Sequence, residues 1–155
     1  MPNRNFLPLL LFVLIAISAC SRQTDTPRDI GEWRDIGSTS EMRFYVSSTV
    51  EEGSKADSPF VGIKTLWDFN QPQKRDDGIY QSAVFIILVD CNRFVGSDFS
   101  YTNFTGKMAT GTVVASGERD IKEAEKELRE ITNPAMKATS EYVCEIKKAG
   151  RLKRP

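Results

Sequence analysis

Apolar and polar positions alternate along much of residues 32–116, which is the pattern of half-buried β-strands. Residues 79–91 are apolar on both faces after Ser82, which predicts a strand at the centre of a sheet. Further runs of this type cover residues 32–37, 43–49, 60–69, 93–104 and 106–116. In residues 60–69 the alternation puts five side chains on one face: Val61, Ile63, Thr65, Trp67 and Phe69. The connections are too short for crossover helices, so we expect an antiparallel sheet of about six strands.

Two longer polar segments separate these strands. Residues 51–59 (EEGSKADSP) are expected to form a loop, and residues 70–78 (NQPQKRDDG) a projecting hairpin tip. Adjacent carboxylates occur in both segments, at Glu51-Glu52 and at Asp76-Asp77. Neighbouring residues of a strand point to opposite faces, and Asp-Asp-Gly is typical of turns, so we interpret both pairs as loop residues.

Helical spacing replaces the alternation after residue 117. Residues 118–131 are rich in helix formers but carry only a thin apolar stripe, which predicts a surface helix. Thr132-Asn133-Pro134 then breaks the chain, with Pro134 suited to the first turn of a new helix and Asn133 or Thr132 to its cap. In this last helix Val143 and Cys144 share the face expected to pack on the sheet.

The chain begins with a short apolar run that ends at a cysteine. Residues 6–19 carry no charge and follow Arg4, which is the layout of a secretory signal. The residues Ile17-Ser18-Ala19-Cys20 resemble the bacterial lipobox, in which the cysteine is lipidated and the signal is cut just before it. Cys20 is therefore the expected lipidation site, with an ordinary secretory signal or an uncleaved anchor as the alternatives. Ser21 stands where Gram-negative lipoproteins of the inner membrane usually carry Asp, which favours the outer membrane.

The chain has three cysteines, and lipidation of Cys20 would leave Cys91 and Cys144. In an oxidising envelope an even pair predicts a disulfide, two free buried thiols being the alternative. This bridge would join the central strand to the last helix. The expected fold class is therefore α+β: a roughly six-stranded antiparallel sheet with a C-terminal helix packed on one face and disulfide-linked to it.

Four parts are expected along the chain. They are a lipoprotein signal peptide (1–19), a lipidated flexible tether (20–30), a single domain (31–148) and a basic tail (149–155). Loss of the signal removes one basic residue and leaves 20 basic against 21 acidic residues, a net charge near −1. Nucleic acid is therefore not an expected partner. The tail is interpreted as a solvated end, with contact to lipopolysaccharide phosphates or an acidic glycan as the alternative.

Candidate catalytic chemistry is scarce in this composition. The chain has no histidine, which removes the commonest general base and the commonest metal ligand. No nucleophile elbow, zinc-protease helix, phosphate-binding loop or dinucleotide fingerprint occurs in the sequence. We therefore expect a protein that is not an enzyme and that needs no metal and no cofactor.

Several stretches resemble the surface-adhesin protein E family of bacterial lipoproteins, over about residues 31–146. They are EWRDIG, LWDFNQPQ, YQSAVFIILVDC, SYTNFTGKMATGTVV and YVC. The most specific part is an ordered set: Trp67, Gln71, Pro72, Gln73, Tyr80, Ser82, Asp90 and Cys91. The resemblance implies an antiparallel sheet with a disulfide-linked C-terminal helix, and adhesion to host matrix proteins. Relatives are also associated with haem, but without histidine the axial ligand would have to be Met or Tyr.

The leading functional hypothesis is a lipid-anchored outer-membrane lipoprotein that acts as a binding or adhesion module, with a host matrix protein as a candidate partner. The candidate binding surface consists of Trp67, Gln71, Pro72 and Tyr80, because exposed aromatic residues are good binding anchors. The alternative is a periplasm-facing carrier or structural lipoprotein that binds a small ligand in a cleft between sheet and helix. Exposed strand edges would also allow a homodimer.

Overall fold

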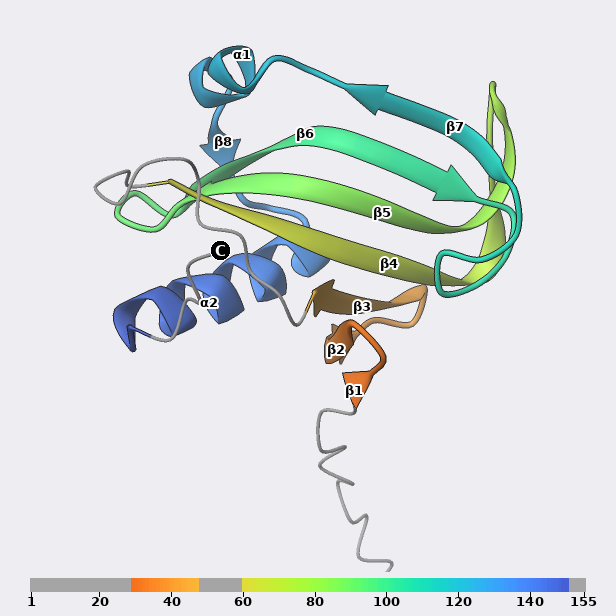
Figure 1. The fold of residues 1–155 in the computed structure, drawn as a ribbon, viewed down its shortest axis with the longest axis horizontal. Helices are drawn as coiled ribbons and strands as arrows, with labels where there is room; N and C mark the ends of the chain where they lie inside the picture. The colour runs from red at the N-terminus through yellow and green to blue at the C-terminus, as the bar shows by residue number, and fades with distance from the viewer. Residues whose placement is uncertain (1–28, 48–59, 151–155) are drawn as a thin grey trace, which may run out of the picture.

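The computed structural model describes residues 29–47 and 60–150, and its framework is one antiparallel sheet (Figure 1). Seven strands follow one another across this sheet in chain order: β1 (Asp29–Ile30), β2 (Trp33–Ser38), β3 (Met42–Ser47), β4 (Phe60–Arg75), β5 (Gly78–Asp90), β6 (Val95–Phe104) and β7 (Val113–Glu118). A two-residue strand, β8 (Arg129–Glu130), pairs with the start of β6. The six longer strands, β2 to β7, confirm the sheet expected from the alternation, with β5 in its interior between β4 and β6.

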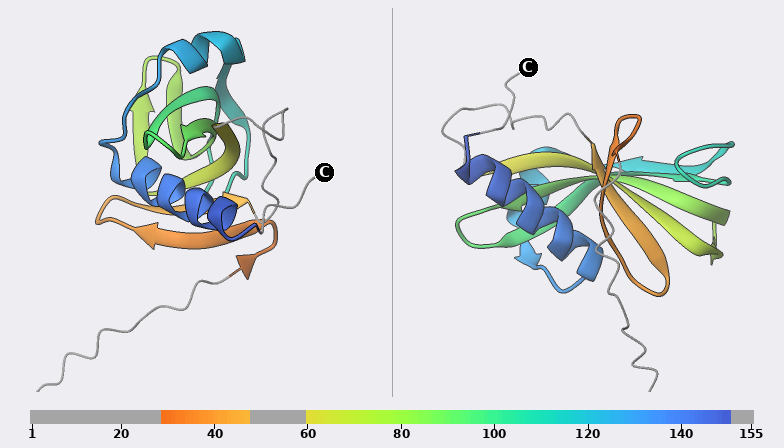
Figure 2. Two further views of the ribbon diagram at one scale, coloured as in Figure 1. Left: turned by 90° about the vertical axis from the view of Figure 1, so that its left-hand side faces the viewer. Right: turned by 90° about the horizontal axis from the view of Figure 1, so that it is seen from below.

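The last helix, α2 (Pro134–Lys148), lies across one face of the sheet (Figure 2). Asn133 caps it, because its side-chain oxygen accepts hydrogen bonds from the backbone N–H groups of Ala135 and Met136. Val143 and Cys144 are buried against a cluster from the middle strands: Val46, Val61, Ile63, Ile87 and Val89. The predicted bridge between Cys91 and Cys144 is present and ties α2 to the end of β5.

A second hydrophobic cluster lies on the opposite face of the sheet. Trp33, Tyr45 and Leu66 are buried there, and Met108 and Ala109 from the β6–β7 connection pack against them. The sheet is therefore covered on both faces in its central part, which explains why β5 is apolar on both sides.

Three expectations need correction. Residues 70–78 do form a hairpin tip, but the turn is shorter than expected: β4 continues to Arg75 and pairs again with β5, so that only Asp76 and Asp77 remain in the turn. Residues 106–112 are not part of a strand, since β7 begins at Val113. The helix expected over 118–131 is limited to α1 (Ile121–Lys126), after which the chain turns into β8. Only Ala124 and Ile131 are buried in this segment, and so thin an apolar stripe is too little to hold a longer helix.

Several expectations fall on residues that the structure does not describe. The signal peptide, Cys20, the tether up to residue 28, the loop 51–59 and the tail after residue 150 lie outside the described ranges. Within those ranges, neither helix is both long and apolar enough to cross a membrane.

Candidate functional site

A cavity of about 840 Å³ opens on the sheet face that α2 partly covers. We call it the aromatic groove, because five aromatic rings contribute to its lining. Its residues come from β4, β5, β6 and α2: Trp67, Phe69, Arg75, Asp76, Asp77, Tyr80, Phe85, Ile87, Asp98, Tyr101 and Met136. The volume is within the range of roughly 300–1,000 Å³ that is typical of ligand sites.

The walls of the groove are set by cross-strand register. Trp67 on β4 contacts Phe85 on β5, with ring centroids 4.4 Å apart, and Phe85 pairs directly with Tyr101 on β6. Near the hairpin end, Phe69 and Tyr80 meet edge to face at 5.6 Å. Gly117 on β7 leaves space for the Tyr101 ring, since a Cβ atom there would come within 2.6 Å of its Cε1 atom. The rings therefore form one continuous aromatic surface across three strands.

The end of the β4–β5 hairpin forms one edge of the aromatic groove. Asp68 pairs with Ser82 and Gln73 with Tyr80, so residues 69–72 on β4 face only one residue on β5. Asn70 fastens this bulge to the β2–β3 turn, through a backbone hydrogen bond to Glu41 and a side-chain hydrogen bond to Ser40. Beyond the bulge the hairpin bends away and rises beside β7 (Figure 1).

Glycine makes this close approach of the hairpin to β7 feasible. Gly78 has a φ of 140°, a conformation that other residues rarely adopt. A Cβ atom at this position would also lie only 2.5 Å from the Val114 Cγ1 atom. The turn that precedes Gly78 can therefore sit over the sheet, and it brings Arg75, Asp76 and Asp77 to the edge of the groove.

The charge at the groove is unbalanced. Three carboxylates, those of Asp76, Asp77 and Asp98, line it together with the single guanidinium group of Arg75. Asp98 lies 3.7 Å from Arg119, which also pairs with Glu127 at 2.6 Å. Within the described residues, no ion pair involves Arg75, Asp76 or Asp77. These three side chains are free to meet a ligand.

Two buried donors near this surface lack an acceptor. The Nε1 atom of Trp67 and the Nδ2 atom of Asn103 are buried and find no hydrogen-bond partner in the described part of the protein. Trp67 and Asn103 both pair with Ala83, from opposite sides, so they lie in one row across the sheet. A buried donor without an acceptor costs about 1–3 kcal/mol, so this row carries unused hydrogen-bonding capacity.

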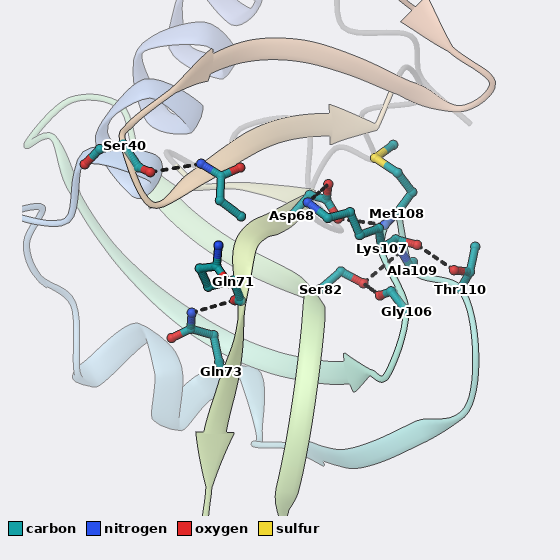
Figure 3. Close-up of polar contacts among 11 residues, drawn as sticks. Ser40, Asp68, Gln71, Gln73, Ser82, Gly106, Lys107, Met108, Ala109 and Thr110 are labelled. Carbon is teal, nitrogen blue, oxygen red and sulfur yellow. Dashed lines mark hydrogen bonds and ion pairs between the residues drawn. The ribbon is translucent and has the colours of Figure 1, made fainter.

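The structure separates the four residues of the predicted binding surface. Trp67 and Tyr80 line the aromatic groove, although Tyr80 is only 9% exposed. Gln71 and Pro72 are exposed in the bulge and do not line it. Gln71 instead accepts a hydrogen bond from the side chain of Gln73 through its carbonyl oxygen (Figure 3).

Several residues of the groove were not predicted from the sequence as site residues. Phe85 belongs to the strand that was expected at the centre of the sheet, and Met136 to the sheet-facing side of the last helix, but neither was expected at a binding site, and Asp98 and Tyr101 were not singled out. The register of β5 with β6 places Tyr101 opposite Phe85 and Asp98 opposite Ile87. A bulge between Ile86 and Ile87 shifts this register by one residue, so simple alternation along residues 93–104 could not have paired them.

Other residues of the family-like stretches hold the β6–β7 connection in place (Figure 3). The Asp68 carboxylate accepts a hydrogen bond from the Met108 backbone N–H at 2.8 Å and lies 3.7 Å from the Lys107 ammonium group. The Ser82 hydroxyl donates to the Gly106 carbonyl at 2.6 Å and accepts from the Ala109 backbone N–H at 3.0 Å. Both side chains are buried, so their role is to position this connection.

Asp90 organises the turn that carries Cys91. Its carboxylate accepts hydrogen bonds from the backbone N–H groups of Asn92 and Arg93, and it pairs with the Arg93 guanidinium at 2.6 Å. Burial raises the pKa of Asp90, but these hydrogen bonds and the Arg93 charge outweigh burial, so the pKa lies below its ordinary value. Asp90 is therefore a charged structural residue at neutral pH.

The groove has few side chains that could bind a metal ion or a haem. Within the described residues, no three His, Cys, Asp or Glu side chains gather in a way that could hold a metal ion. The chain lacks histidine, and the groove offers only Met136, Tyr80 and Tyr101 as axial ligands for a haem iron. Tyr80 is buried against Phe69, so we assign no haem to this site.

Comparison with known proteins gives one family. Neither the curated proteins nor the solved structures contain a match to this chain. The family model described as surface-adhesin protein E matches residues 33–151, which is most of the chain and includes every strand of the groove. The chain therefore belongs to the surface-adhesin protein E family.

Proposed function

We propose that this protein is a lipid-anchored binding module of the outer membrane that attaches to a macromolecular partner, with a host matrix protein as the first candidate. The observation that carries the proposal is membership in a surface-adhesin family, which supports an adhesin-like protein at the cell surface or in the envelope. The aromatic groove adds a physical site, since buried aromatic side chains dominate the energetics of protein interfaces. Family membership also favours a binding role over an enzymatic one.

Lipid anchoring is the second part of the proposal. It rests on the lipobox-like residues 17–20, with Cys20 as the acylated residue, and on residues 21–28 as a tether that is shorter than expected, because Asp29 and Ile30 belong to β1. Two or three acyl chains on one residue would hold the protein stably on a bilayer, where a single chain binds only marginally. The domain, proposed as residues 31–148, would then stand clear of the membrane surface.

Protease shaving of intact cells tests the location. With Cys20→Ser as the unanchored control, we expect the wild-type protein to stay with the outer membrane and to be cut on whole cells. The control should appear in the soluble fraction. Protection of the wild-type protein until the outer membrane is opened would place the domain in the periplasm and would remove the basis for host adhesion.

Adhesion is tested separately with surfaces coated with matrix proteins. Cells that carry the protein should attach more strongly than cells that lack it, and Cys20→Ser cells should resemble the latter. Equal attachment of all three strains would contradict the adhesion part of the proposal.

A second candidate function is favoured by the volume of the groove. A cavity of about 840 Å³ with aromatic walls could hold a small apolar ligand, as a periplasm-facing carrier would. Native mass spectrometry of the protein isolated from its envelope tests this directly. A bound small molecule would support the carrier, whereas protein that is entirely ligand-free would argue against it.

A further inference from the structure

The aromatic groove differs from an ordinary apolar cavity in its charge. Aromatic faces carry the negative part of the ring quadrupole, and five rings line this groove. Its edge adds the carboxylates of Asp76 and Asp77 beside the single guanidinium group of Arg75, while the third carboxylate, that of Asp98, lies 3.7 Å from Arg119. The surface is therefore electrostatically complementary to a cation and would repel an anion.

We propose that the aromatic groove binds an extended peptide segment that carries a lysine or arginine side chain. The proposal rests on the proposed binding function and names the chemistry of its partner. The methylene stem of such a side chain packs against the rings of Trp67, Phe85 and Tyr101, and its cationic head lies toward Asp76 and Asp77.

The unpaired carboxylates at the groove favour this occupant over others. Asp76 and Asp77 make no ion pair within the described residues, so they are available to a cation from outside. A purely apolar ligand would leave these carboxylates partly desolvated and without a partner.

The hairpin end makes the charged edge accessible to a partner. Asp76 and Asp77 lie in the β4–β5 turn and Arg75 directly before it, and all three are exposed at the edge of the groove. Met136 at the start of α2 lines the groove as well. Methionine is flexible and polarizable, so it can adapt to side chains of different shape.

Tryptophan fluorescence provides a direct test. The chain has two tryptophans, and Trp33 lies in the cluster on the opposite face, so Trp33→Phe leaves Trp67 as the single reporter. The full chain with this substitution is reconstituted in phosphatidylcholine nanodiscs, whose net charge is zero. The probes are the blocked peptide Gly-Lys-Gly-Lys-Gly and its counterpart with Glu in place of both lysines.

We expect the lysine peptide to change Trp67 emission saturably, with calorimetry on the same samples as a second readout. The glutamate peptide should have no effect, and raising the salt from about 20 to about 500 mM should weaken lysine-peptide binding. Asp76→Asn with Asp77→Asn should lower the affinity about tenfold, because two partly exposed ion pairs are lost. Asp76 and Asp77 are the two central residues of the turn and neither has a positive φ, and Asn is as well suited to turns as Asp, so this variant should keep its melting temperature.

The matched control removes two acidic charges elsewhere. Glu141→Gln with Glu145→Gln changes the net charge equally on exposed positions of α2 that do not line the groove, and it should bind as the parent does. Equal affinity of the Asp76/Asp77 variant and this control would overturn the proposal, as would equal binding of the two peptides or no response in either readout. If cells still attach to matrix proteins in that case, the proposed adhesion stands and uses another surface. If neither peptide binding nor cell attachment is observed, both the groove proposal and the adhesion proposal are rejected.

Discussion

The carboxylate of Asp68 accepts a hydrogen bond from the backbone N–H of Met108, at 2.8 Å and across 40 residues of sequence. Met108 has a φ of 53°, which non-glycine residues adopt only when the surrounding structure supports it. This one contact ties the strand that carries Trp67 to the β6–β7 connection, which covers the face opposite the groove. The groove thus depends on contacts made on both faces of the sheet.

Removal of the Asp68 carboxylate should destabilise the protein. In Asp68→Ala the Met108 N–H loses its acceptor in a part-buried position, so we expect the free energy of unfolding to fall by about 1–3 kcal/mol. Asp68→Asn retains an acceptor oxygen and loses only the interaction with Lys107, which is partly exposed, so its effect should be smaller. Urea unfolding measures both variants, and equal losses would mean that the Met108 contact contributes nothing.

Reduction of the disulfide should have a larger effect. Cys91 and Cys144 are 53 residues apart, and a loop of this length corresponds to roughly 4 kcal/mol in the chain-entropy description of disulfides. The melting temperature should therefore fall sharply in reducing agent, and Cys91→Ser with Cys144→Ser should melt at the reduced value. Cys20→Ser, which keeps the bridge, is the control. An unchanged melting temperature in reducing agent would show that the disulfide does not stabilise the protein.

Acid should weaken the turn that Asp90 organises. The folded-state pKa of Asp90 is lowered, so its contribution to stability is complete above the ordinary aspartate pKa of about 4 and is lost as the pH falls through the folded value. Asp90→Asn should cost roughly 1 kcal/mol at pH 7, because Arg93 is largely in solvent and the pair is screened. The difference between wild type and variant should shrink toward pH 2. A difference in unfolding free energy between wild type and Asp90→Asn that is the same at every pH would contradict the lowered pKa of Asp90.

Gly117 should influence the groove without supporting the fold. In Gly117→Ala the new Cβ atom would lie 2.6 Å from Tyr101, whose ring must move along the groove to make room. The displaced atoms are at the end of a side chain, so we expect little change in melting temperature. Acrylamide quenching of Trp67 in the Trp33→Phe background should change, whereas Ser116→Ala, at an exposed neighbouring position, should leave it unaltered. Identical quenching in all variants would show that Tyr101 does not shape the site.

The periodic parts of the sequence predicted the framework well. Alternation over residues 60–69 placed Val61, Ile63 and Trp67 on one face, and all three face the side that α2 covers or the groove beside it. Asn133 and Pro134 marked the start of α2 because a capping side chain and a fixed φ act within one turn. Cys91 and Cys144 could be paired by counting, once Cys20 was assigned to lipid.

The groove depended on information that no local pattern contains. Residues 70–78 look like a polar loop, yet Gln73 and Tyr80 pair because the bulge at residues 69–72 is fastened to the β2–β3 turn. That anchor comes from Ser40 and Glu41, about 30 residues earlier in the chain. The short helix α1 likewise gives way to β8 because Arg129 and Glu130 find open pairing sites on β6.

By itself, the sequence determined the alternating strands, the caps, the cysteine pair and the family, since each depends on residues close together or on their identity alone. Only the tertiary structure decided that Trp67, Tyr101 and Met136 share one cavity with the Asp76-Asp77 turn. The reason is physical: strand register, bulges and the bend of a hairpin are fixed by contacts between distant segments. Those contacts exist only once the sheet has formed.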